Sequence, residues 1–279
     1  MNGNATTATA PLVSAVGLSA KGKQLRALAL PILAPLAVFF GVGVVWYVLS
    51  HTIAPLVPDP IQTYRESAEF IWHPFYDYGP NDKGLGWQVL LSLQRVAIGF
   101  FLASAVAIPL GLLIGSSQIL RWGFDPLIQL LKPVSPLAWL PLGLAVFQAA
   151  DPSAIFTIFI TSLWPTVANT AFGVRSLNPE YRNVARVLNL SRWTYLRKIL
   201  LPATLPYIMT GLRISLGIAW LVIVAAEMLT GGVGIGFFAW DSWNNLNLAH
   251  VILAILVIGC VGLILDRLMG FVEARLNRI

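Results

Sequence analysis

Six long apolar runs constrain this chain more than any other feature of its sequence. They cover residues 27–50, 88–115, 124–149, 153–174, 202–230 and 249–270. About twenty apolar residues in a helix cross the hydrocarbon core of a bilayer, where only a helix or a closed barrel satisfies its own backbone hydrogen bonds. Charged residues make up 11% of the chain, against roughly 25% in soluble domains. The sequence therefore predicts an all-α membrane protein with six transmembrane helices.

The predicted organisation is one transmembrane domain, residues 27–279, preceded by a cytoplasmic tail, residues 1–26. The tail has no basic residue ahead of its mildly apolar stretch, and the first strong apolar run is too long for a cleaved signal segment. Residues 51–87 form an external segment, in which residues 61–72 have the spacing of a short amphipathic helix.

Basic residues predict how these helices are oriented. They concentrate before the first span, after the second, between the fourth and fifth, and at the C-terminus. The opposite side carries Arg65 and Lys83, with Arg95 just inside the second span. By the positive-inside rule both termini are cytoplasmic. Topology thus explains the net charge of +6, and no nucleic-acid-binding surface is expected.

Two spans carry local signals. Small residues recur every four positions in the second span, a spacing that favours close helix packing in lipid. These residues are Ala103, Ala107, Gly111 and Gly115. Prolines in the third span remove backbone donors and predict a broken helix, which either fits neighbouring helices or lines a polar pathway. They are Pro133, Pro136 and Pro141.

The cytoplasmic loop of residues 175–201 is the most informative stretch. Asn178 followed by Pro179 is a typical helix start. Asn189 adopts the left-handed conformation that ends a helix more readily than most residues. An apolar stripe runs between them. Taken alone, such a loop is compatible with a short interacting helix or with a basic loop that only sets topology.

The loop resembles the signature of permease subunits of bacterial binding-protein-dependent ABC importers, which reads EAA, three residues, Gly, nine residues, Ile, one residue, Leu-Pro. The matching positions are Asn183, Val184, Ala185, Asn189, Ile199, Leu201 and Pro202. The chain departs at the Glu and the first Ala, and Asn189 stands in place of Gly. The stretches SLQRVAIGF, KPVSPLAWLPLGL and GGVGIGFFAWDSWN extend the resemblance to the nitrate, sulfonate, taurine and bicarbonate branch, and most closely to cyanobacterial nitrate/nitrite and bicarbonate permeases.

This resemblance implies a type I ABC importer permease fold in the bacterial inner (plasma) membrane, importing a small oxyanion. Nitrate/nitrite is the expected substrate and bicarbonate the alternative. The implied partners are a second permease copy, two cytoplasmic ATPase subunits and a periplasmic or lipid-anchored substrate-binding protein. The loop is expected to form a coupling helix that docks on the ATPase. Its expected contacts are Val184, Ala185, Val187, Leu188 and Asn189.

Polar and aromatic side chains within the spans are candidates for the translocation pathway. They are Trp139, Gln148, Asn169, Trp220 and Glu227. An ionisable residue at membrane depth is a functional candidate, and we expect Glu227 to pair with a basic residue or cap backbone donors at an outer gate. Arg95 and Arg213 are candidates for attracting or compensating negative charge.

No residues point to catalysis or to a bound cofactor in this chain. The phosphate-binding sequence GxxxxGK[ST] is absent, so ATP and Mg are expected on the partner subunits. The run GGVGIG at 231–236 lacks the lysine and is interpreted as an external turn. The three histidines are widely spaced and predict no metal site. A different class, an ATP-independent secondary anion transporter, would show internal repeats and intramembrane ion sites, and no repeat is evident.

Overall fold

The computed structural model describes residues 13–80 and 82–276. It divides into two compact units, residues 1–62 and 63–279. The regular structure of the described residues is helical apart from one isolated bridge between Asp77 and Lys83. Five of these helices are long and apolar enough to cross a membrane, and a sharply bent pair makes up to six spans. The predicted all-α fold is confirmed.

The first unit contains α1, Val13–Thr52, a helix that includes Pro31 and Pro35. Residues 13–26 of the predicted tail are helical, and residues 1–12 lie outside the described part of the chain. The apolar stretch Leu33–Thr52 is long and apolar enough to cross a membrane. Within α1, the indole N–H of Trp46 donates to the carbonyl of Pro58 at 3.0 Å and holds the turn that follows the helix.

The segment predicted to be external, residues 51–87, contains two short helices where the sequence predicts one. They are α2, Pro60–Glu66, and α3, Ala68–Trp72. The N–H of Ser67 donates to the carbonyl of Thr63, and the N–H of Ile71 donates to the carbonyl of Ser67. Because these bonds span the break, the interruption of the helix is local. In the loop that follows, burial raises the pKa of the Tyr76 phenol above its usual value. A hydrogen bond from Lys83 lowers the pKa of Asp77.

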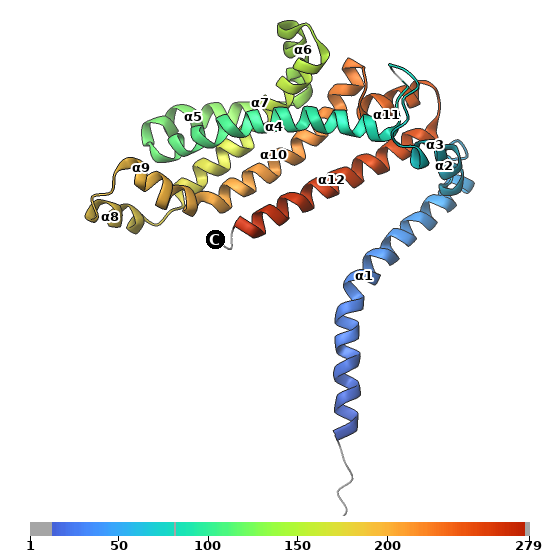
Figure 1. The fold of residues 1–279 in the computed structure, drawn as a ribbon, viewed down its shortest axis with the longest axis horizontal. Helices are drawn as coiled ribbons and strands as arrows, with labels where there is room; N and C mark the ends of the chain where they lie inside the picture. Colours follow the sequence, from blue (N-terminus) through green and yellow to red (C-terminus); the bar gives the residue numbers. More distant parts are fainter. Residues whose placement is uncertain (1–12, 81, 277–279) are drawn as a thin grey trace, which may run out of the picture. The chain divides into compact units, whose positions relative to one another are not determined.

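Four long helices form the body of the second unit and run alongside one another (Figure 1). They are α4, Leu85–Ser116; α7, Ala150–Arg175; α10, Leu201–Thr230; and α12, Leu248–Leu276. Helix α7 packs against both α4 and α10. A Cβ on Gly111 would lie 2.6 Å from Thr170 of α7, and one on Gly115 would lie 2.5 Å from Val174. The small residues of α4 therefore allow the close helix packing that their spacing predicts.

The third predicted span is broken, as its prolines indicate. It consists of α5, Gln118–Leu131, and α6, Pro136–Phe147, which are bent by 97° across residues 132–135. Pro136 occupies the first turn of α6, where its missing N–H costs no hydrogen bond. Gln148 ends α6 in the left-handed conformation, with φ of 52°.

Short helices occupy the two ends of the body. Helix α8, Pro179–Val187, and helix α9, Arg192–Tyr195, lie at one end, and the π-helix Leu196–Leu200 joins α9 to α10. Helix α11, Ile235–Asn244, lies at the opposite end with α3 (Figure 1). The positive-inside rule predicts that the α8 end faces the cytoplasm.

Candidate functional site

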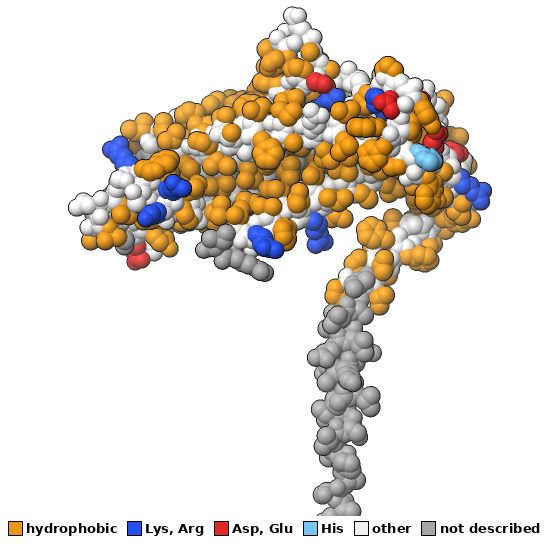
Figure 2. Space-filling model, viewed as in Figure 1, with side chains coloured by type: hydrophobic (Ala, Val, Ile, Leu, Met, Phe, Trp, Pro, Cys, Tyr) orange, Lys and Arg blue, Asp and Glu red, His pale blue; other side chains and the backbone are white. Residues whose placement is uncertain are grey.

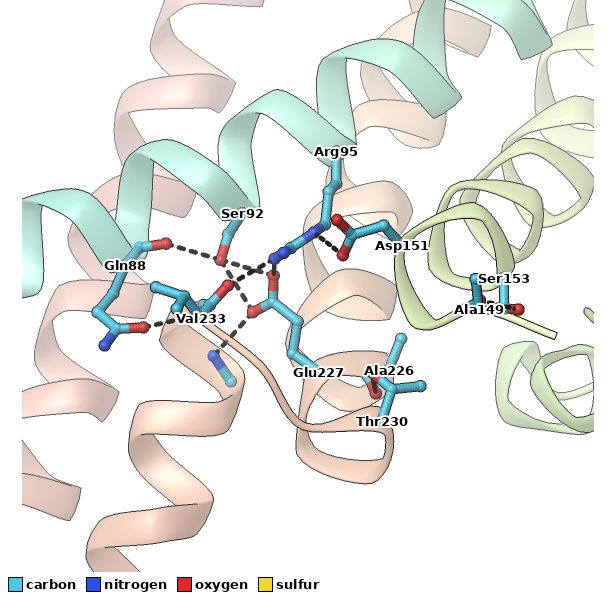
Figure 3. Close-up of polar contacts among 12 residues, drawn as sticks. Gln88, Ser92, Arg95, Ala149, Asp151, Ser153, Ala226, Glu227, Thr230 and Val233 are labelled. Atoms are coloured by element: carbon cyan, nitrogen blue, oxygen red, sulfur yellow. Dashed lines mark hydrogen bonds and ion pairs between the residues drawn. The ribbon is translucent and has the colours of Figure 1, made fainter. Parts of the chain in front are cut away.

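A polar stripe on α4 organises the end of the body that carries α3 and α11, which the positive-inside rule predicts to be external. Gln88, Ser92 and Arg95 lie at positions i, i+4 and i+7, so they share one face of an otherwise apolar helix. Figure 3 shows this face turned toward Glu227 of α10 and toward the loop before α11. Glu227 is 2% exposed, so its carboxylate requires partners from within the protein.

The carboxylate of Glu227 receives three donors from two segments, α4 and the first turn of α11. The Ser92 hydroxyl donates to it at 2.8 Å, Arg95 Nη1 at 2.8 Å and the backbone N–H of Gly236 at 3.0 Å. The expected pairing with a basic residue and the capping of a backbone donor are thus both present. A buried charge with this many partners is compatible with a stable fold, whereas the loss of one partner would leave the other charge uncompensated.

The same residues hold the glycine-rich loop 231–236. Gln88 Oε1 accepts from the N–H of Gly234 at 2.6 Å, and the Ser92 hydroxyl accepts from the N–H of Ile235 at 3.0 Å. These bonds satisfy donors at the start of α11 that have no partner within that helix. A Cβ on Gly234 would lie 2.3 Å from the carboxyl carbon of Glu227, so glycine is required there. The loop is a compact turn, as predicted, and it is anchored on a buried charge.

Arg95 extends this arrangement to a third helix. Its Nε donates to Asp151 Oδ1 at 2.9 Å, and its Nη1 also donates to the carbonyl of Val233 at 2.8 Å. Asp151 lies in the first turn of α7 and its side chain is 64% exposed. We refer to Gln88, Ser92, Arg95, Asp151 and Glu227 as the outer polar cluster. It ties α4, α7, α10 and the loop before α11 together by charge-assisted hydrogen bonds.

A groove of about 490 Å³ lies beside the break between α5 and α6. Residues of α7 and α10 form the rest of its lining. Trp139 and Asn169, two of the predicted pathway residues, line it together. Among the described lining residues, Lys132 is the one charged side chain, and the lining is otherwise largely apolar.

The remaining predicted pathway residues lie outside this groove. Trp220 is buried, and its indole N–H donates to the carbonyl of Ile258 in α12 at 3.0 Å. Gln148 is the C-cap of α6, and Glu227 belongs to the outer polar cluster. Arg213 is paired with Asp266 of α12 through two hydrogen bonds of 2.7 and 2.8 Å, so it fixes α10 to α12.

Helix α8 has the start and the end that the sequence predicts. Asn178 Oδ1 accepts from the N–H of Glu180 at 3.0 Å. Asn189 has φ of 47°, and the N–H of Leu190 donates to the carbonyl of Ala185 at 3.0 Å, which is the bonding of a Schellman C-cap. Val187 and Leu188 are 82% and 62% exposed. The side chain of Val184 lies outside the described residues. The helix thus ends in an exposed apolar pair.

Sequence reasoning missed Gln88, Ser92 and Asp151. The two α4 residues had a detectable signal, since a polar residue at i, i+4 and i+7 of an apolar span marks a face turned to protein. Asp151 had none, because an acidic residue in the first turn of a helix is common. In the described part of the chain, no three His, Cys, Asp or Glu side chains gather as they would around a metal ion.

Comparison with known proteins identifies the family. The family described as "Binding-protein-dependent transport system inner membrane component" matches residues 107–278. The nitrate import permease protein NrtB of Synechocystis sp. is 51% identical over 231 residues, which cover 83% of this chain and 84% of that protein. The bicarbonate transport system permease protein CmpB of Synechococcus elongatus is 47% identical over 245 residues, or 87% and 88% of the two chains.

Solved structures show the same fold at low sequence identity. An inward-facing form of the MetNI methionine ABC transporter aligns with a TM-score of 0.56 at 14% identity, over 70% of this chain and 94% of the other. An amino acid ABC transporter aligns with a TM-score of 0.53 at 17% identity, over 78% and 99%. The chain therefore belongs to the inner-membrane components of binding-protein-dependent transport systems, the multi-pass permeases of ABC importers.

Proposed function

We propose that this chain is the permease subunit of an ATP-driven importer of nitrate/nitrite. The observation that carries the proposal is the 51% identity to a nitrate import permease over 83% of this chain. Bicarbonate is the second candidate, because permeases named for bicarbonate transport are 47% identical over 87% of it. Both anions are small, planar and singly charged, so one passage serves either.

The groove beside the α5–α6 break fits an anion pathway. A passage for a negative ion is helped by a positive charge and hindered by carboxylates in a medium of low dielectric constant. Among the described groove residues, Lys132 provides the positive charge, and none is an acid. Trp139 and Asn169 are the proposed pathway residues within it. Glu227 is proposed to position the external end of the body. Gln148 and Trp220 are proposed to line the pathway in another conformation of the transporter.

The transporter is proposed to contain two copies of this permease, two ATPase subunits and a binding protein on the outer side. ATP and Mg bind to the ATPases, and the permease carries no cofactor of its own. Helix α8 is the proposed coupling helix. Its proposed contacts with the ATPase are Val184, Ala185, Val187, Leu188 and Asn189. The exposure of Val187 and Leu188 supports this assignment, because a few apolar anchors in a groove supply most of the affinity of such a contact.

Uptake into proteoliposomes tests the function. Vesicles contain the permease with its co-purified ATPases, the binding protein is supplied on the side that it faces, and labelled nitrate or bicarbonate is followed with and without ATP. Nitrate uptake that requires ATP supports the proposal, and bicarbonate uptake instead selects the second candidate. Uptake that is indifferent to ATP would favour a secondary transporter.

Leu188→Asp tests the coupling helix. A carboxylate in an apolar groove is strongly unfavourable, so nitrate uptake should be lost while the permease still inserts and folds. Trp193→Asp is the matched control, since Trp193 is a similarly exposed apolar residue of the same loop. Full uptake by Leu188→Asp would show that α8 does not dock through this residue.

A further inference from the structure

A second cavity, outside the proposed pathway, lies at the end of the body that carries α8 and α9. It has a volume of about 540 Å³, and its walls come from the ends of α4, α5 and α7 and from α8 and α9. Its polar lining includes Ser116, Arg121, Arg175, Asn178, Asn183 and Tyr195. A neighbouring hollow of about 720 Å³ shares Ser116 and Tyr195 and adds Arg192. Figure 2 shows Lys and Arg side chains gathered at this end.

The charges of this cavity are unbalanced. Arg121 and Arg175 line it, and no Asp or Glu is among its described lining residues. Arg175 has a long contact of 3.4 Å with Asp125, and both side chains are 36% exposed, so the pair is weak. The Nε of Arg121 is buried and makes no hydrogen bond to any described residue. A buried N–H without an acceptor is unfavourable, so Arg121, next to the cavity, has an unmet hydrogen-bonding capacity.

We propose that this cavity is a binding site for an oxyanion. A guanidinium group presents its donors in a planar fork that matches the oxygens of a phosphate, nitrate or carboxylate group. Arg121 and Arg175 supply two such groups, and the amide of Asn183 and the hydroxyl of Tyr195 add neutral donors. The oxyanion is either free in the cytoplasm or the phosphate of an anionic phospholipid. Basic pockets at the cytoplasmic ends of membrane helices suit lipid headgroups, and Trp122 beside Arg121 is 71% exposed.

Occupancy of this site has a structural consequence. Asn183 belongs to α8, whereas Arg121 and Arg175 belong to α5 and α7. A single anion that contacts all three connects the proposed coupling helix to the ends of the membrane helices. This binding does not depend on which anion the transporter carries, and it is measurable without transport.

The binding test uses the purified permease–ATPase complex. Inorganic phosphate and nitrate are titrated in separate thermal-shift experiments in detergent. Retention of phosphatidylglycerol is measured by native mass spectrometry after exchange from nanodiscs of phosphatidylcholine with and without phosphatidylglycerol. A saturable shift with phosphate or nitrate supports a free oxyanion, and selective retention of phosphatidylglycerol supports the lipid source. The absence of both for the wild-type complex overturns the proposal.

Variants connect the binding to the cavity. Arg121→Gln and Arg175→Gln should each weaken the affinity roughly tenfold or more, because each removes a charge-assisted contact. Arg121→Lys keeps the charge but lacks the planar fork, and it should give an intermediate loss in a folded protein. Arg267→Gln, an equal charge change on exposed α12, should bind as the wild type does. An equal loss in Arg267→Gln would show general screening of charge and refute the site.

Discussion

Replacing Glu227 with glutamine tests the outer polar cluster most directly. The amide has nearly the same shape as the carboxylate but carries no charge, and its NH2 group faces donors where the carboxylate has acceptor oxygens. The donors around Glu227 are the Ser92 hydroxyl, Arg95 Nη1 and the N–H of Gly236. One of them must lose its acceptor in the variant. Arg95 also loses the buried half of its charge compensation and keeps only the exposed Asp151.

The size of the effect follows from this loss. Removing one partner of a buried ion pair costs about 3–5 kcal/mol. We expect the lower end, about 3 kcal/mol, because Asp151 and the carbonyl of Val233 still contact Arg95. At 2–4 °C per kcal/mol for a domain of comparable size, the melting temperature should fall by roughly 6–12 °C.

Thermal unfolding of the purified complex in detergent measures this fall. Glu273→Gln is the matched control, because Glu273 lies 3.7 Å from Arg213 and is partly exposed, so it should cost no more than about 1 kcal/mol. A double-mutant cycle with Arg95→Gln should show a coupling of about 1–3 kcal/mol. If Glu227→Gln melts within a degree or so of Glu273→Gln, the cluster does not stabilise the external end in the way described.

Substitutions at three further positions have defined outcomes. Gly111→Leu should prevent the close approach of α4 to α7, because even a Cβ would lie 2.6 Å from Thr170. Gel filtration should show aggregated or misassembled protein for this variant and not for the control Ile119→Ala, which changes an exposed residue. Asn189→Gly should keep the C-cap of α8. Asn189→Val should destabilise the fold by about 1–2 kcal/mol, because residue 189 has φ of 47°, and should weaken co-purification of the ATPases. Equal co-purification of the two variants would argue against a role of this turn in docking. Lys132→Gln should lower nitrate uptake at low ionic strength roughly tenfold, with a smaller effect at high salt, and unchanged uptake would remove Lys132 from the pathway.

Local rules account for the elements that the sequence predicts correctly. Length and hydropathy identify the spans, Pro133 and Pro136 identify the break in the third one, and Asn178 and Asn189 identify the limits of α8. Each of these features depends on residues within a few positions of one another. The external helix at residues 61–72 was predicted as one piece because its apolar spacing continues through Ser67, where the backbone is interrupted.

The candidate sites were predicted less completely. Glu227 was recognised as an unusual acid within a span, but its partners come from α4, more than a hundred residues away, and from the first turn of α11. Trp220 and Asn169 looked alike as polar or aromatic residues of spans. The structure places Asn169 at the groove and Trp220 against α12.

The sequence by itself determined that the chain is a multi-pass helical membrane protein, because apolar length, proline placement and helix caps act locally and do not depend on how the helices pack. Only the tertiary structure decided which polar side chains meet. A buried charge such as that of Glu227 is stable only next to specific donors, and those donors are brought together by the packing of α4 and α10. The packing of the ends of α4, α5 and α7 decides that the Nε of Arg121 is buried beside a cavity and has no acceptor among the described residues.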